Sequence, residues 1–105
     1  MIDLPNSITL QIDGDDIPSQ EVLLDERHFL RGAVDVQNRD IYLEFSSRES
    51  LYDFAKSLLY EAVYGQGGQK EFYPLVAEGK ALVVEGARLT EDSSRIFVTY
   101  PNSAS

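Results

Sequence analysis

The sequence contains no cysteine, no tryptophan and a single histidine among its 105 residues. The absence of cysteine excludes disulfide bonds, thiolate metal sites and a cysteine nucleophile. His28 has no second histidine or cysteine with which to share a zinc ion, so we expect neither a metal site nor a cofactor. No Gly-x-Ser-x-Gly motif accompanies this histidine. We therefore expect no catalytic residues and a protein that is not an enzyme, with a small enzyme that uses His28 as the alternative.

Long apolar runs are also missing. No run approaches the ~18 residues that a membrane-spanning helix needs. The first residues, Met1–Pro5, have neither the basic region nor the apolar core of a secretion signal. We therefore expect a cytoplasmic protein with no membrane partner.

Positive charge is scarce, because 9 lysine and arginine residues face 18 acidic residues, for a formal net charge of −9. Nucleic acids and anionic membranes attract basic surfaces, so this balance argues against both as partners. An acidic surface is compatible with a basic protein partner, whose association it would accelerate through long-range attraction.

One stretch, Ser46–Tyr64, has clear helical periodicity. Its apolar residues recur at helical spacing and predict a face that packs on the core: Leu51, Phe54, Ala55, Leu58, Leu59, Ala62 and Val63. Ser46 is the expected N-cap, since Glu49 follows it by three residues in a capping box, and Ser47 is the competing cap. Gly65 is expected to end the helix in the left-handed conformation.

Alternating apolar and polar residues predict the strands. The expected strands are Ser7–Asp13, Phe29–Val36, Ile41–Phe45, Phe72–Val76, Ala81–Leu89 and Arg95–Tyr100. The second and third of these should form an antiparallel hairpin, because only a short polar turn separates them. On these strands Ile8, Leu10, Ile12, Ile41, Leu43 and Phe45 are expected to face inward. The segment Pro18–Ala33 is ambiguous, and a helix over Ser19–Ala33 is the alternative to an early strand.

These elements predict an α+β fold in which an antiparallel sheet of about five strands carries one amphipathic helix packed on one face. The length fits a single domain over residues 1–105. Within it we expect a flexible loop at 65–70, where glycine is frequent, and a flexible tail at 101–105.

Two groups of side chains are candidates for binding a partner. Asp35, Tyr42 and Glu44 are expected on the outer sheet face, where they would mix acidic and aromatic groups. Tyr60 and Tyr64 lie on the predicted helix away from its apolar residues, and tyrosine brings large contact area at little entropic cost. The alternatives are a solvated outer sheet face and tyrosines that cover the margin of the core.

The resulting functional hypothesis is a small acidic protein-binding module with a basic partner. The general profile resembles that of bacterial immunity proteins, which neutralise a cognate toxin, and that of other small inhibitors and adaptor domains. The alternative is a structural or regulatory domain that forms homo-oligomers through an edge strand.

Overall fold

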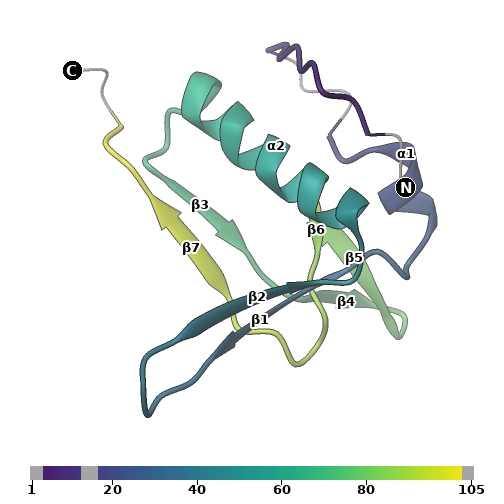
Figure 1. The fold of residues 1–105 in the computed structure, drawn as a ribbon, viewed down its shortest axis with the longest axis vertical. Helices are drawn as coiled ribbons and strands as arrows, with labels where there is room; N and C mark the ends of the chain where they lie inside the picture. Colours follow the sequence, from purple (N-terminus) through teal and green to yellow (C-terminus); the bar gives the residue numbers. More distant parts are fainter. Residues whose placement is uncertain (1–3, 13–16, 103–105) are drawn as a thin grey trace.

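The computed structural model describes residues 4–12 and 17–102, which form an α+β fold around one long helix (Figure 1). This confirms the predicted fold class. The elements, in chain order, are α1 (Gln20–Leu24), β1 (Leu30–Val34), β2 (Ile41–Phe45), α2 (Arg48–Tyr64), β3 (Gln69–Phe72), β4 (Leu75–Ala77), β5 (Lys80–Val84), β6 (Ala87–Arg88) and β7 (Ile96–Thr99).

The strands are divided among three small antiparallel sheets rather than joined in one. These sheets are the β1–β2 hairpin, the β3–β7 pair and the β4–β5–β6 meander. The predicted hairpin is confirmed, with Leu30 opposite Phe45 and Val34 opposite Ile41. Backbone hydrogen bonds link β1 to the segment after β6, since the carbonyl of Leu30 accepts from the Thr90 amide at 3.1 Å.

The core lies where α2 meets the hairpin and the β3–β7 pair. Phe54 of α2 stacks at a tilt between Phe45 and Phe72, with ring centroids 5.5 and 4.8 Å apart. Leu30 and Leu89 are also fully enclosed there. The enclosed apolar set is small for a chain of this length, because many other large apolar side chains remain exposed.

The face of α2 that packs on the body of the protein is polar, which contradicts the predicted apolar face. The buried residues of α2 are Ser50, Asp53, Phe54 and Ser57. Of the residues predicted to form the apolar face, Phe54 lies in the core and the partly buried Leu58 packs against it. The remainder is exposed: Leu51, Ala55, Leu59, Ala62 and Val63.

Close backbone approach explains this rotation of the helix. Gly86, in the turn between β5 and β6, lies so near α2 that an added Cβ would sit 2.6 Å from the Asp53 carbonyl oxygen and 3.1 Å from the Ser57 Cβ. A small side chain at Ser57 leaves room for this turn, and a leucine would not. The apolar periodicity of α2 therefore does not identify its buried face.

Several predicted strands differ from the structure, where Phe72–Val76 is divided between β3 and β4 and Ala81–Leu89 between β5 and β6. Residues 7–12 form no strand, with Ile8 and Ile12 exposed, and Asp13 lies outside the described residues. Segment Pro18–Ala33 contains the short helix α1 and the start of β1, so the strand predicted from Phe29 is confirmed and the alternative helix over Ser19–Ala33 is wrong. On β2 only Phe45 is even half-buried, and Ile41 and Leu43 are exposed rather than inward.

Both ends of α2 also differ in detail from the prediction. Ser47 is the N-cap and accepts from the Ser50 amide, whereas Ser46 bonds to Arg27 and Phe29. Gly65 ends the helix in an extended conformation rather than a left-handed one. The predicted loop 65–70 is shorter, because β3 begins at Gln69 and buries Lys70.

Replacing Gly86 with alanine should destabilise the protein, because the new methyl group would meet the rigid backbone of α2. We expect a loss of about 1–3 kcal/mol in the free energy of unfolding, measured by urea denaturation. Gly67→Ala is the matched control, since its added Cβ would meet only one atom, at 3.9 Å. An unchanged stability for Gly86→Ala would contradict the packing described here.

Candidate functional site

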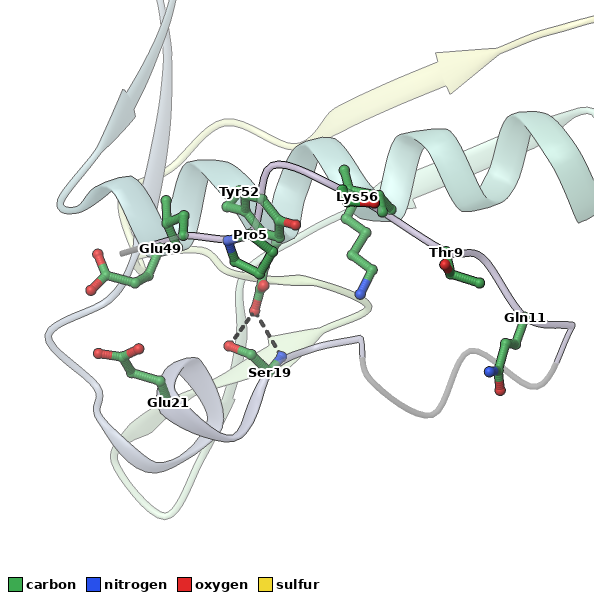
Figure 2. Close-up of a pocket in the computed structure, with 12 residues that line it drawn as sticks. Pro5, Thr9, Gln11, Ser19, Glu21, Glu49, Tyr52 and Lys56 are labelled. Carbon is green, nitrogen blue, oxygen red and sulfur yellow. Dashed lines mark hydrogen bonds between the residues drawn. The ribbon is translucent and has the colours of Figure 1, made fainter. Parts of the chain in front are cut away.

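A half-open cleft of about 510 Å³ separates the N-terminal segment from the first half of α2 (Figure 2). Residues of the segment 4–11 form one wall. The other wall is polar, with the side chains Ser19, Glu21, Glu49, Tyr52, Asp53 and Lys56. Clefts that combine apolar walls with a few converging polar groups are where small ligands usually bind.

Asp53 fixes the start of α1 to the side of α2. Its carboxylate Oδ2 accepts from the backbone amide of Ser19 at 2.8 Å and from the Ser19 hydroxyl at 2.9 Å. Ser19 is the N-cap of α1 and accepts from the Val22 amide. Asp53 is almost fully buried, so these hydrogen bonds replace the water that its carboxylate would otherwise bind.

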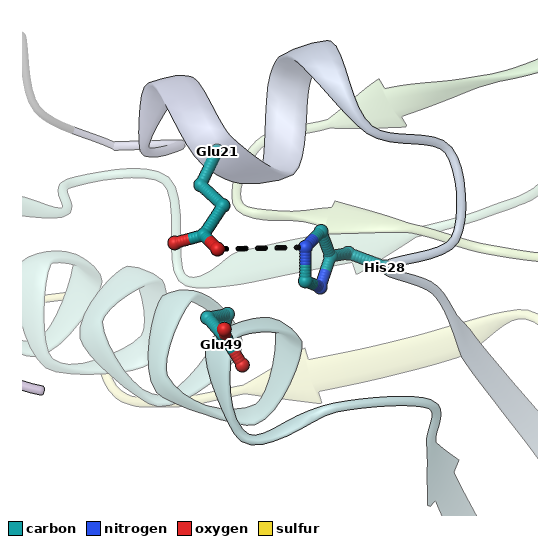
Figure 3. A group of neighbouring side chains, drawn as sticks. All are labelled: Glu21, His28 and Glu49. Carbon is teal, nitrogen blue, oxygen red and sulfur yellow. Dashed lines mark ion pairs between the residues drawn. The ribbon is translucent and has the colours of Figure 1, made fainter. Parts of the chain in front are cut away.

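Beside this link, three potential metal ligands converge from different elements: Glu21 of α1, His28 of the following loop and Glu49 of the first turn of α2 (Figure 3). One ligand atom of each lies within 4.8 Å of the others. His28 is buried, and its Nε2 lies 3.9 Å from Glu21 Oε1 and 3.7 Å from Asp25 Oδ2. Both distances exceed the length of a hydrogen bond.

Glu49 points a carboxylate oxygen into the protein without a partner. Its Oε1 is sealed from solvent and meets no hydrogen-bond donor in the part of the chain that the structure describes. A buried carboxylate oxygen without a donor is costly, because its hydration is lost and nothing replaces it. The position therefore needs a cation or a donor from outside these residues.

The loop that carries His28 is held by the buried guanidinium of Arg88. This group donates to the carbonyl oxygens of Asp25 and His28 at 2.9 Å and of Leu23 at 3.2 Å. Its Nε also donates to the Ala81 carbonyl at 3.1 Å. Burial lowers the pKa of Arg88 from its usual value, and nearby Glu26 and Asp25 partly oppose that shift.

Asp25, the carboxylate nearest the imidazole of His28, is held by Arg27. The Arg27 side chain donates to both oxygens of Asp25, at 2.8–3.2 Å. This interaction keeps the pKa of Asp25 far below its usual range. Asp25 therefore adds a negative charge next to Glu21 and His28.

The sequence reasoning missed Glu21, Glu49 and Asp53 as site residues. Glu21 and Glu49 each follow a serine N-cap by two residues, which places both in the first turn of a helix. Their positions in a first turn could be predicted from the sequence. Their convergence on His28 could not be predicted, because it depends on how α1 packs against α2.

The structure separates the predicted partner-binding residues into two places. Tyr42 and Glu44 lie on the outer side of the hairpin, where Arg31 bridges Glu44 and Asp92 at 2.8 and 2.9 Å. Asp35 shapes the hairpin turn by accepting from the amides of Gln37 and Asn38.

Tyr60 and Tyr64 lie elsewhere and bind the N-terminal segment. The Tyr64 hydroxyl donates to the Leu10 carbonyl at 3.2 Å, and the Tyr60 hydroxyl donates to the Ile12 carbonyl. Their rings pack against each other with centroids 5.1 Å apart. The hydroxyl groups of both tyrosines are therefore already hydrogen-bonded within the chain.

Comparisons with models of known protein families, with curated proteins and with solved structures gave no match. Over residues 4–12 and 17–102, no helix has both the length and the apolar character needed to cross a membrane.

Exposed apolar side chains gather on the outward side of α2, and others lie on the hairpin. Phe45 packs on Phe54, so the alternate residues Leu43 and Ile41 project from the same side of β2. We call this set the apolar surface: Leu51, Ala55, Leu59, Ala62 and Val63 of α2 with Val34, Ile41 and Leu43 of the hairpin. Ile41 is 72% exposed and Val63 is 56% exposed.

The pKa of Asp92 lies below its usual value, because the Thr90 hydroxyl and then Arg31 bind its ionised form. A lowered folded-state pKa adds stability above the unfolded value of about 3.9, and this is lost as the pH falls through the folded value. Asp92→Asn should therefore be less stable than the parent at pH 6, with the difference disappearing near pH 2. Urea denaturation at both pH values would measure this, with Glu91→Gln as the charge-matched control. A difference independent of pH would refute it.

Proposed function

We propose that this chain is a protein-binding module that binds a basic partner through the apolar surface. The observation that carries the proposal is a helix whose outward face is almost entirely apolar. On a soluble monomer such a face normally points to the core, and contiguous exposed apolar residues mark interaction sites.

The exposed area of the chain supports a missing partner. A folded monomer of this mass exposes about 5,900 Å², whereas this chain exposes 7370 Å². The Cα radius of gyration is 14.3 Å, against about 12.9 Å for a compact domain of this length.

Charge favours a basic partner over a second copy of the chain. Several basic side chains are already paired with carboxylates of the same chain, namely Arg27, Arg31, Lys70 and Arg95. The excess of 18 acidic over 9 basic residues therefore remains available at the surface. Two copies, each with a charge of −9, would repel each other, and a basic protein would be attracted.

Tyr42 and Glu44 alternate with Ile41 and Leu43 along β2 and therefore point to the opposite face of the hairpin, and Asp35 lies at its turn. These three residues are not part of the apolar surface. An inhibitor that neutralises a basic toxin is one form that such a module takes.

Two adjacent leucines provide a test of which face of α2 is free. Leu59→Asp should change the free energy of unfolding by less than about 1 kcal/mol, because Leu59 is exposed. Leu58→Asp should cost about 2–4 kcal/mol, because Leu58 packs against the core. Urea denaturation of both variants measures the contrast. Equal destabilisation by the two substitutions would mean that the apolar face is buried.

Partner binding is tested with the same Leu59→Asp variant. Tagged parent protein is used to capture partners from a lysate of the source organism at low and high salt, and any captured protein is purified and titrated against both forms. We expect one basic protein whose affinity falls with salt and falls at least about 30-fold for Leu59→Asp. Retention of full affinity by the variant would contradict the proposed surface.

Sedimentation velocity separates the homo-oligomer from this proposal. The parent should remain a monomer at micromolar concentration. A dimer that Leu59→Asp dissociates would show that a second copy, rather than a basic protein, covers the apolar surface.

A further inference from the structure

We propose that Glu21, His28 and Glu49 bind a divalent transition-metal ion, for which zinc is the best fit. The three side chains come from α1, the loop after it and the first turn of α2, and they converge beside the cleft (Figure 3). This site is separate from the apolar surface and from the binding function proposed above.

The hydrogen bonds around Ser47 are compatible with a His28 ring that carries its proton on Nδ1. The Ser50 hydroxyl donates to the Ser47 carbonyl at 2.9 Å, so its proton is already used. The Ser47 hydroxyl then donates to Ser50 Oγ at 3.1 Å. In that arrangement, Nδ1 of His28 supplies the proton for the remaining contact, 2.6 Å from Nδ1 to Ser47 Oγ. With the proton on Nδ1, Nε2 has a free lone pair that can bind a metal ion.

This lone pair faces carboxylate oxygens rather than donors. Nε2 lies 3.9 Å from Glu21 Oε1 and 3.7 Å from Asp25 Oδ2. The sealed Oε1 of Glu49 has no donor either among the residues described. Electron-rich atoms brought this close repel one another unless a cation lies between them.

The spacing and chemistry of the three groups fit one ion. Two ligands of a tetrahedral zinc ion lie about 3.4 Å apart, given zinc–nitrogen and zinc–oxygen bonds of about 2.0–2.2 Å. The ligand atoms here lie within 4.8 Å of one another, which modest rotation of the glutamate side chains would close. Imidazole favours transition metals over calcium and magnesium, and carboxylates complete the set.

The surroundings have the features of a supported metal site. A ligating histidine usually donates its other ring N–H to an oxygen, and Ser47 Oγ lies 2.6 Å from His28 Nδ1, in place to accept such a bond. Arg88 fixes the backbone of the same residue through its carbonyl. Glu21 and Glu49 also line the cleft, so the ion would be reachable from solvent on that side. Its binding would tie α1 and the loop to α2.

The test is a calorimetric titration of chelator-treated protein with zinc chloride, and separately with magnesium chloride. We expect one zinc ion per chain, a higher melting temperature with zinc, and no comparable effect of magnesium. Glu21→Gln should weaken zinc binding at least about tenfold. Glu21 is exposed on a short helix, so this variant should still fold. Glu91→Gln removes the same charge elsewhere and should bind zinc like the parent.

Because His28 is the only histidine, nitrogen NMR of its ring gives a direct second readout. Zinc should shift the Nε2 resonance and leave Nδ1 protonated. Absence of saturable zinc binding would overturn the proposal. Zinc binding that leaves the His28 ring unchanged, or that Glu21→Gln leaves unaltered, would show an adventitious ion only and would also overturn it.

Discussion

The buried guanidinium of Arg88 is the constraint on which the N-terminal half of the structure depends. It donates to four carbonyl oxygens, those of Leu23, Asp25, His28 and Ala81, and forms no ion pair with a carboxylate of residues 4–12 or 17–102. Three of these belong to the end of α1 and the loop after it, where carbonyl groups lack the partners that a continuing helix would supply. One planar group with five donors thus fixes an irregular segment that has little apolar packing of its own.

The hydrogen bonds of Arg88 also affect the orientation of α2. With α1 and its loop held by Arg88, the buried Asp53 can bind the N-cap Ser19, and Gly86 can press against the backbone of the helix. Both contacts require the polar face of α2 to point inward. Five apolar side chains are therefore left outside, where water opposes them by about 25 cal/mol for each Å² exposed. A partner that covers this face would recover that free energy on binding.

The features that depend on residues close together in the sequence could be predicted. The extent of α2, the β1–β2 hairpin and the α+β class follow from helical periodicity, alternation and turn chemistry. The buried face of α2 could not be predicted, because it is decided by a glycine 33 residues after Asp53 and by a serine 34 residues before it. The Glu21–His28–Glu49 cluster escaped for the same reason. Each of its residues looked ordinary in its local context, and only the packing of α1 on α2 brings them together.

The helix geometry keeps the two proposed sites physically independent. At 100° per residue, Glu49 lies about 80° from Leu59 and roughly 120° from Ala55 around the helix axis. Val63 is nearer in angle, at about 40°, but lies about 21 Å further along α2. A protein that covers the apolar surface would therefore leave the cleft open, and an ion between Glu21 and Glu49 would not contact that protein. The ion would instead act on the rigidity of α1 and its loop, because it adds a third link to those made by Asp53 and Arg88. Loss of either site should consequently leave the other measurable.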